Sequence, residues 1–558
     1  MRVFLQAMLL GLALSTALCA QSQPLLQLQG QPYFGGNMSL HLAGPVGQPA
    51  LLAYGLEPLP LDEPIQTSKG AWYIGSLVNL VAIGSIPSGG RINLPFTMPP
   101  AVPAVAGLQL VMQGSVPFAL SNPATLPLDT PHYLLQDSAL LTATVPMQAA
   151  DFGDRIASGD FNADGAKDLA AGAWSENDAS LQWSGRAYVL WGPDFTSSTP
   201  LSSPNPKAHG HFGCGIAVAD ISGDGIDDVI VAETTGGDPP TPTAFAHLYV
   251  YAGSSSFSTV PSLALPSAGT GFDYALHGRR MTTGDFDGDG SADIAVGVFL
   301  GSTTANEYEG WIDVYWGPNY GSPMPLYSPD PGVNDFFGNE LCTADVNGDG
   351  IDDLVESSAR ETAGGTWGIG RAHLFVGPTL SPYKTIENPL PAGSNSWFGN
   401  AVAAADMNAD GMADVLITDQ KDHAFIFWSP DFTTYQVIDR PPPWIVGNED
   451  SASFGYFATL ADVNDDGQAD AVVSDVFSGT ASSCSLSKGG IVFVALAPYF
   501  ATFHVLTAKV PECGAEFGWS LHSVDLDGDE RVELLVGSDL GDVGAVTGAG
   551  HITLFSGN

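Results

Sequence analysis

Basic residues are scarce in this chain. Its 558 residues include 17 Lys and Arg against 60 Asp and Glu, which gives a formal net charge of −43 at pH 7. Proteins bind nucleic acid through clusters of Lys and Arg, so no nucleic-acid partner is expected. High net charge often accompanies disorder, but 44% apolar residues with 66 Gly and 41 Pro favour many short strands joined by tight turns.

Long apolar runs are missing after the first 20 residues. No later run approaches the ~18 apolar residues of a membrane span, so no integral membrane segment is expected. Residues 1–20 combine Arg2, an apolar run from Val3 to Leu14 and small residues near Ala20, which are features of a signal peptide. They predict a secreted protein, extracellular or periplasmic, whose mature chain begins at Gln21.

Cysteine is also rare, with five residues in the whole chain. Cys19 lies in the predicted signal peptide and leaves lipidation open, although its flank lacks the small residue that a lipidated cysteine prefers. Cys484 and Cys513 lie in polar sequence and could pair in an oxidising compartment. Cys214 and Cys342 lie in predicted strands and fit buried free thiols.

Familiar catalytic motifs are missing too. The chain contains no His-Glu-x-x-His, no Gly-x-Ser-x-Gly and no phosphate-binding Gly-rich motif. His209 and His211 lie two apart, and solvated loop histidines explain them better than a metal pair does. A glycosidase-like carboxylate pair stays open because acids are so abundant. Calcium binding or exposure to water explains most of these acids better, so we predict that the protein is not an enzyme.

What the chain does have is an acidic motif that recurs seven times. In the stretch from Asp285 to Asp293, carboxylates occupy positions 1, 3, 5 and 9, glycine occupies position 6, and an apolar strand follows. Self-similarity at a roughly fixed period predicts a repeat architecture. The seven loops are 56 to 65 residues apart and begin at Asp160, Asp220, Asp285, Asp345, Asp406, Asp462 and Asp525.

The repeats extend well beyond the acids. Eight residues before each first Asp stands Phe-Gly, or His277-Gly278 in the third repeat; the six Phe residues are Phe152, Phe212, Phe337, Phe398, Phe454 and Phe517. A small residue follows four positions after each ninth position, and a third and a looser fourth strand come next. Four antiparallel strands per repeat make a propeller blade, so seven repeats predict seven blades. We expect the segment from Ala139 to Val145, within residues 138–146, to supply the missing fourth strand of the last blade.

These repeats resemble the FG-GAP repeats of integrin α-subunit propellers and of many exported bacterial proteins, over about residues 138–558. Residues 21–130 carry no such loop, and their short apolar runs between Gly- and Pro-rich turns predict a β-sandwich-like domain. The predicted fold is therefore all-β: a seven-bladed β-propeller with calcium-binding hairpin loops, preceded by a small β-sandwich-like domain.

Calcium is the expected cofactor of these loops, with up to seven ions per chain. It takes six to eight oxygen ligands, which side chains at positions 1, 3, 5 and 9 and the carbonyl of position 7 can supply. The second loop has Ser222 as a poorer ligand, and the seventh has Glu530 in place of glycine. The predicted ligands are Asp160, Asn162, Asp164, Ala166, Asp168, Asp220, Ser222, Asp224, Ile226, Asp228, Asp285, Asp287, Asp289, Ser291, Asp293, Asp345, Asn347, Asp349, Ile351, Asp353, Asp406, Asn408, Asp410, Met412, Asp414, Asp462, Asn464, Asp466, Gln468, Asp470, Asp525, Asp527, Asp529 and Glu533.

Recognition is expected on the face opposite the acidic loops. The segments there carry aromatic residues that could stack on sugars or anchor a protein, although packing between blades also explains them; they are Trp174, Trp183, Phe336, Trp367 and Trp397. We expect a monomeric, non-catalytic adhesion or ligand-binding protein, and the resemblance implies that its partner is a protein or a glycan at the cell surface. The alternatives are a sugar-binding lectin and a polysaccharide-degrading lyase or hydrolase on a calcium-propeller scaffold.

Overall fold

The computed structural model describes individual strands within residues 1–131 by their backbone, and most of the chain from residue 135 onward. In that second part it does not describe residues 144, 178–180, 235–246, 267–277, 303–305, 363–366, 391–395, 421, 442–452, 479–488, 501, 509–513 and 558. Cys19, Cys484, Cys513 and His277 lie outside the described residues. The chain divides into two compact units, Met1–Pro131 with Leu496–Thr502, and His132–Ala495 with Phe503–Asn558.

The described part of the first unit consists of short strands. Two three-stranded antiparallel sheets have the orders β2-β3-β8 and β12-β9-β4, and the remaining strands pair two by two. The packing of these sheets as a sandwich stays a prediction. The strands are β1 (Leu10–Gly11), β2 (Leu25–Gly30), β3 (Asn37–Ala43), β4 (Ala53–Leu56), β5 (Ile65–Thr67), β6 (Gly70–Trp72), β7 (Val81–Ala82), β8 (Arg91–Thr97), β9 (Gln109–Gln113), β10 (Ser115–Val116), β11 (Ala119–Leu120) and β12 (Ala124–Pro127).

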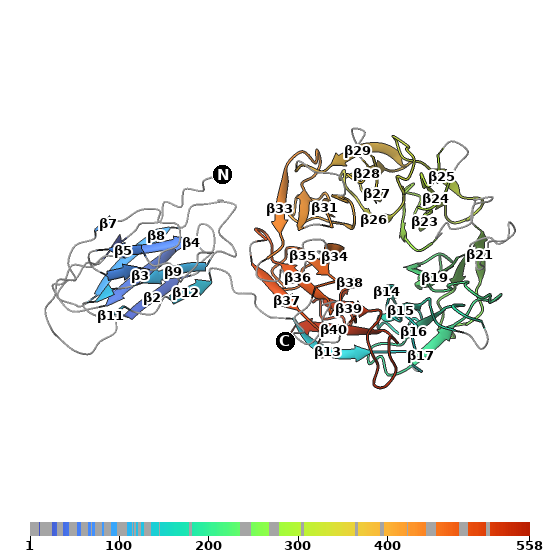
Figure 1. The fold of residues 1–558 in the computed structure, drawn as a ribbon, viewed down its shortest axis with the longest axis horizontal. Coiled ribbons are helices and arrows are strands. Elements are labelled where there is room, and N and C mark those ends of the chain that lie inside the picture. Colours follow the sequence, from blue (N-terminus) through green and yellow to red (C-terminus); the bar gives the residue numbers. More distant parts are fainter. Residues whose placement is uncertain are drawn as a thin grey trace. The chain divides into compact units, whose positions relative to one another are not determined.

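The second unit is a ring of seven four-stranded antiparallel sheets (Figure 1). The predicted seven-bladed β-propeller is therefore confirmed. Blades one to six each use four consecutive strands, and the loop between the first two strands carries the acidic motif. Their strands are β14 (Ile156–Gly159), β15 (Asp168–Ala173), β16 (Arg186–Leu190), β17 (Ser198–Leu201); β18 (Gly215–Ala219), β19 (Asp228–Glu233), β20 (His247–Tyr251), β21 (Leu263–Pro266); β22 (Met281–Gly284), β23 (Asp293–Gly297), β24 (Ile312–Tyr315), β25 (Met324–Leu326); β26 (Glu340–Ala344), β27 (Asp353–Ser358), β28 (Arg371–Val376), β29 (Ser381–Glu387); β30 (Val402–Ala405), β31 (Asp414–Thr418), β32 (His423–Phe427), β33 (Tyr435–Asp439); β34 (Phe454–Ala461), β35 (Asp470–Asp475), β36 (Ile491–Ala495) and β37 (Phe503–Leu506).

The seventh blade is built from both ends of the repeat region. It contains β38 (Ser520–Val524), β39 (Glu533–Ser538) and β40 (His551–Gly557), and its outer strand is β13 (Leu135–Leu141). β13 pairs antiparallel with β40, with a bulge between Asp137 and Ala139. The strand thus begins before the expected segment from Ala139 to Val145 and ends within it. Because the outermost position of blade seven is filled from the far end of the sequence, the ring closes without an additional strand.

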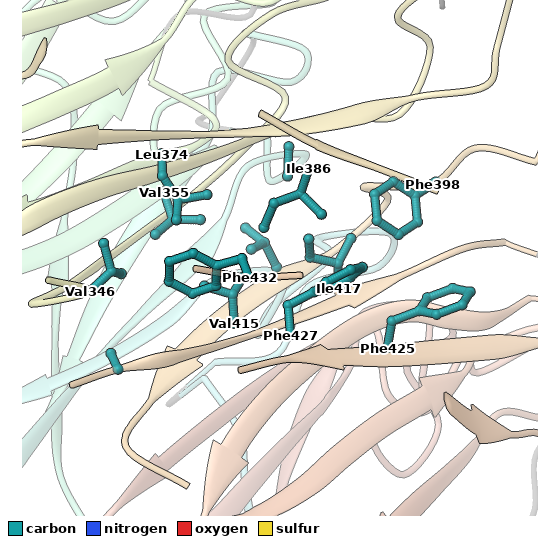
Figure 2. Packing of buried hydrophobic residues seen from close by; sticks show 13 residues of the cluster. Val346, Val355, Leu374, Ile386, Phe398, Val415, Ile417, Phe425, Phe427 and Phe432 are labelled. Carbon is teal, nitrogen blue, oxygen red and sulfur yellow. The ribbon is translucent and has the colours of Figure 1, made fainter. Parts of the chain in front are cut away.

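Burial follows the position of a strand in its blade. The second strands, such as β19 and β27, are buried along their whole length, whereas the outer strand β25 is largely exposed. Neighbouring sheets cover both faces of the inner strands, which explains their near-continuous apolar sequences. Figure 2 shows one such core, in which Val355 and Leu374 of blade four pack with Val415 and Phe427 of blade five.

The Phe-Gly pairs hold neighbouring blades together. All six Phe side chains are fully buried, and full burial of one such side chain is worth roughly 1.5–3 kcal/mol. The following glycine is needed for two reasons at Gly213: its φ is +88°, and a Cβ there would lie 2.1 Å from the Arg186 carbonyl oxygen. A Cβ on Gly172 would lie 2.2 Å from the Gly213 carbonyl oxygen of the next blade. The small residue after each acidic loop is thus a point of close approach between blades.

Candidate metal centres

The seven acidic loops lie at the same end of their blades. Each connects the first strand to the second, so all of them open onto one side of the ring, which we call the cation face. The residue at position 2 of each loop is buried, as Phe161, Phe286 and Val346 illustrate. This apolar side chain anchors the loop in the core while its carboxylates stay near solvent.

The third loop shows how the backbone orders the carboxylates. The two carboxylate oxygens of Asp285 accept hydrogen bonds from the amides of Asp289 and Gly290, at 3.0 and 2.9 Å. Asp287 also accepts from the Asp289 amide at 3.1 Å, and Asp289 accepts from the Ser291 amide at 2.8 Å. The first, fourth, fifth and sixth loops repeat the bond from position 6 to the position-1 carboxylate. The loop geometry is therefore set by backbone donors within the loop.

Two of the loops bring three carboxylates together closely enough for one cation. Single oxygens of Asp285, Asp287 and Asp289 all lie within 4.8 Å of one another. The same holds for Asp525, Asp527 and Glu533. Ligands around a calcium ion lie 2.3–2.6 Å from it, so oxygens at this separation can share one ion. The donors are hard oxygens, and these residues therefore fit a hard divalent cation such as Ca²⁺.

The carboxylate at position 9 has a second task. In the third blade, Asp293 is buried, and its two oxygens accept from the amides of Phe286 and Gly317 at 2.9 and 2.7 Å. Burial raises the pKa of Asp293 to about 6. This side chain ties the loop to the end of the third strand, and Asp293 is not among the three converging carboxylates of its loop. Its role as a calcium ligand stays a prediction.

The second and seventh loops, which depart in sequence, keep the bond from position 6 to the position-1 carboxylate and differ from the others in detail. Glu530 of the seventh loop adopts a φ of +70°, the conformation that glycine takes in the others, and its amide donates to Asp525 at 2.9 Å. The loop shape is thus kept at the cost of backbone strain. In the second loop, the Ser222 hydroxyl donates to Asp220 at 3.4 Å, and the Ser222 amide donates to Asp228 at 2.8 Å.

Sequence reasoning missed two positions in these loops. The residue at position 4 also adopts a left-handed backbone conformation, as Ala163 (φ +60°) and Ala409 (φ +59°) show. Glycine occupies this position in four loops, and this pattern could have predicted the conformation from the sequence. Position 8 connects blades, because the Asp352 carboxylate of blade four accepts from the Asp285 amide of blade three at 2.9 Å. Asp227 of blade two does the same for Asp160 at 3.0 Å. Neighbouring loops are therefore mechanically connected.

The opposite face, which carries the Phe-Gly segments, is closed at its centre by side chains from several blades. We call it the Phe-Gly face. Arg155 of blade one donates to the Arg279 carbonyl of blade three at 3.2 Å. The guanidinium groups of Arg155 and Arg280 lie 5.8 and 5.4 Å from the ring centroid of Phe457 in blade six. These arginines already have acidic partners in Asp154 and Glu340. The charges of these arginines at the centre are thus paired within the protein.

The first aromatic group on the Phe-Gly face joins blades one and two. Trp183 is 42% exposed, and its ring centroid lies 5.0 Å from that of His209. His211 packs at 5.0 Å from Trp174, and burial lowers its pKa to about 4. The expectation of two solvated histidines is therefore wrong for His211, because tryptophans from the neighbouring blade cover it.

The second aromatic group joins blades three, four and five. The Arg360 guanidinium carbon lies 4.8 Å from the Phe336 ring centroid and 5.1 Å from that of Trp397. Tyr308 stacks on Phe336 with ring centroids 6.1 Å apart and planes 4° from parallel. Trp367 is 43% exposed. Four of the five aromatic residues singled out in the sequence thus fall into two groups, and Trp367 is next to Gly368, whose backbone bonds to those of Arg360 and Trp397. Sequence reasoning missed Arg360, which follows β27 and belongs to no repeat motif.

A buried acid–histidine pair also occurs, inside blade four. A carboxylate oxygen of Glu361 lies 2.7 Å from Nε2 of His373, and both side chains are almost fully buried. Burial raises the pKa of nearby Glu356 to about 8. Groups enclosed in this way cannot reach a polysaccharide, so they stabilise the blade and do not supply the carboxylate pair of a glycosidase.

Comparison with known proteins identifies relatives for part of the chain. A family model described as FG-GAP-like repeat matches residues 160–231. The chain is 32% identical over 153 residues to Integrin alpha-PS2 of Drosophila melanogaster, covering 26% of this chain and 10% of that protein. It is 33% identical over 169 residues to Integrin alpha-IIb of Mus musculus, covering 28% and 16%. It is 31% identical over 170 residues to Phosphatidylinositol-glycan-specific phospholipase D of Rattus norvegicus, covering 28% and 20%.

These matches span a fifth or less of the relatives' own lengths. They therefore bear on the repeats and not on the whole proteins. Among the described residues, no helix has the length and apolar character needed to cross a membrane.

Proposed function

We propose that this chain, whose FG-GAP-like repeats form a seven-bladed β-propeller, is a calcium-binding, non-catalytic protein that binds a ligand at or outside the cell surface. The observation that supports the proposal is that the two faces of the ring carry different kinds of side chain. Preformed acidic loops line the cation face, and two aromatic groups lie on the Phe-Gly face. The similarity to integrin α subunits supports a binding role for such a ring.

Calcium has a structural role in this proposal. Each ion would offset two of the excess negative charges that otherwise repel one another within the compact ring. Because Asp352 and Asp227 connect neighbouring loops, an ion in one loop also stiffens the contact to the next blade. Affinities of ~10⁻⁴–10⁻³ M suffice for extracellular modules, so individually weak loops would still be filled outside the cell.

The proposed location depends on the N-terminal segment. Residues 1–20 would direct export and be removed, and residues 21–130 would form a separate β-sandwich-like domain before the propeller. N-terminal sequencing of the protein recovered from the medium or periplasm should then begin at Gln21. A mature chain that retains Met1 would contradict export by this route.

Binding arrays test the function itself. The recombinant full chain, loaded with calcium, should bind a protein or a glycan on arrays of extracellular proteins and oligosaccharides. Glycan binding alone would identify a lectin, and protein binding would identify an adhesin. Removal of calcium should reduce binding by destabilising the fold. Release of reducing or unsaturated ends from polysaccharides would overturn the non-catalytic proposal in favour of a hydrolase or lyase.

The similarity to a phosphatidylinositol-glycan-specific phospholipase D favours one specific enzymatic alternative. A lipase of that kind would release a lipid-anchored protein from detergent micelles into the aqueous phase. We expect no release by this chain above the rate of a buffer control, with or without calcium. Calcium-dependent release would show that this chain shares a catalytic activity with the phospholipase and is not only a binding protein.

A further inference from the structure

Arg360 differs from the other arginines whose side chains the structure describes. Each of these others has a carboxylate within 4.0 Å, and they are Arg155, Arg186, Arg279, Arg280, Arg371, Arg440 and Arg531. Arg360 has no carboxylate partner among the described residues, although the chain contains 60 acids and only 17 bases. A cation left without an acid in so acidic a protein indicates that its charge has another use.

Two rings hold the Arg360 guanidinium in place. Phe336 and Trp397 lie 4.8 and 5.1 Å from its central carbon, and each immediately precedes the Phe-Gly pair of its blade. Both rings come from residues with left-handed φ, +59° and +51°. Such cation–π contacts are attractive because the ring faces are electron-rich. They position the guanidinium plane but use none of its N–H groups.

The N–H groups of Arg360 are therefore available to a ligand. Within the described part of the chain, the residue's hydrogen bonding is limited to its carbonyl, which accepts from the Gly368 amide at 3.3 Å. A planar guanidinium with free edges matches a carboxylate, which accepts two parallel N–H bonds. Because the aromatic rings fix the plane in advance, little side-chain entropy remains to be lost on binding.

A neighbouring residue points to the rest of the ligand. Trp367 is 43% exposed and precedes Gly368, whose amide donates to the Arg360 carbonyl at 3.3 Å and whose carbonyl accepts from the Trp397 amide at 3.1 Å. The backbone at Trp367 is thus held between the backbones of Arg360 and Trp397. An exposed indole offers a flat apolar surface for the C–H face of a pyranose ring. We propose that Arg360, with Phe336, Trp397 and Trp367, forms a binding site for a hexuronate residue of a glycan. This inference rests on the proposed ligand-binding function and names the class of ligand.

Hexuronate fits better than an acidic peptide. Both supply the carboxylate, but only the sugar adds a rigid ring whose face can cover Trp367. Net charge of −43 opposes a dense polyanion at long range. At physiological ionic strength, charges more than ~8 Å away are largely screened. The binding free energy of a single carboxylate at Arg360 is therefore set by its contact with the guanidinium and not by the net charge of the chain.

Titration with small carboxylated and neutral sugars tests the site. The full chain in millimolar calcium is titrated with methyl glucuronide, methyl glucoside and N-acetyl-aspartate amide, followed by tryptophan fluorescence. Methyl glucuronide should bind on the order of tenfold more tightly than the other two, a difference of about 1.4 kcal/mol. Methyl glucoside lacks the carboxylate that pairs with the guanidinium, and the aspartate derivative lacks the sugar ring that covers the indole. Equal affinity for the two sugars, preference for the aspartate derivative or no binding of the glucuronide would each overturn the inference.

Matched arginine variants assign the effect to this residue. R360Q should lose about tenfold in affinity for methyl glucuronide, and R360K should lose nearly as much because lysine lacks the planar fork. R531Q removes an arginine of the cation face that pairs with Asp465, and it should bind like the unmodified chain. Unchanged affinity in R360Q, with a normal thermal melt, would overturn the site. If R360Q still binds its array ligand, the proposed function stands and only the inference about Arg360 fails.

Discussion

At the residue scale, the ring depends on places where a side chain is absent. Gly172 has an ordinary backbone conformation, yet a Cβ there would lie 2.2 Å from the Gly213 carbonyl oxygen. Gly537 repeats this contact between the last blade and the first, with 2.4 Å to the Gly153 carbonyl oxygen. The constraint is therefore space between blades and not backbone freedom.

Gly172→Ala should destabilise the propeller by about 1–3 kcal/mol, the usual cost of overpacking a tight interior. Gly321→Ala is the matched control, because nothing lies within 4 Å of its added Cβ. That control should change the free energy of unfolding by less than about 0.5 kcal/mol. Denaturant unfolding in saturating calcium measures both, and equal stability of the two variants would contradict the account of blade contacts.

Glu530 offers the opposite case, in which a side chain is present where glycine fits better. Its φ of +70° costs a non-glycine residue about 1–2 kcal/mol. Glu530→Gly should therefore stabilise the chain by about 1 kcal/mol after the entropy of the unfolded glycine is subtracted. Thermal melts at fixed calcium check this, and a lower melting temperature would show that the Glu530 side chain contributes more than its backbone costs.

At the scale of elements, the acidic hairpin loop is the repeated unit of the cation face. The third loop has three acidic side chains at positions 1, 3 and 5, whereas the fourth has Asn347 at position 3. The third is also one of two loops whose carboxylates converge within 4.8 Å. It belongs to the repeat in which His277 replaces Phe, so tight metal binding would compensate for a weaker apolar anchor.

Asp289→Ala and Asp349→Ala compare these two loops directly. Both remove the position-5 carboxylate, and both break one bond from the position-7 amide, at 2.8 and 2.9 Å. Ligand binding stabilises by RT ln(1 + [L]/Kd), so loss of the tighter site costs more at the same calcium concentration. The calcium-dependent rise in melting temperature should fall further in Asp289→Ala. An equal fall in both variants would remove the special role of the third loop.

The elements were largely predictable because their signals are local. Strand, acidic loop and second strand follow one another within twenty residues, and the Phe-Gly pair and loop spacing recur in register. The start of β13 at Leu135 was not predictable, because it is set by pairing with Gly557 at the far end of the chain. The Arg360 site was missed for the same reason, since Phe336 and Trp397 come from different blades.

At the scale of the whole molecule, the closure between blades one and seven concentrates buried acids. Asp539 follows β39, is buried, and one of its carboxylate oxygens has no hydrogen-bond partner among the described residues. Burial, followed by the nearby charges of Asp154, Glu516 and Asp151, raises its pKa to about 9. The folded ring therefore holds this carboxyl as a neutral acid at pH 7.

A pH dependence follows from that shift. Between the unfolded pKa near 4 and the folded value near 9, the native state binds more protons than the unfolded state, so stability falls as pH rises. Unfolding free energy at constant free calcium should decline from pH 6 to pH 9. Asp539→Asn should flatten that decline, and an identical pH profile in this variant would refute a titrating role for Asp539.

Calcium binding by the repeated loops can be tested by counting the bound ions. The full chain is dialysed to equilibrium against 1 mM calcium, near the upper end of the ~10⁻⁴–10⁻³ M range expected of extracellular modules, and ions per chain are determined by atomic emission. If the loops bind calcium, several ions per chain should be found, up to one for each of the seven loops, and about one fewer in Asp285→Ala. Less than one bound ion per chain, or the same number in Asp285→Ala, would rule out calcium binding by these loops.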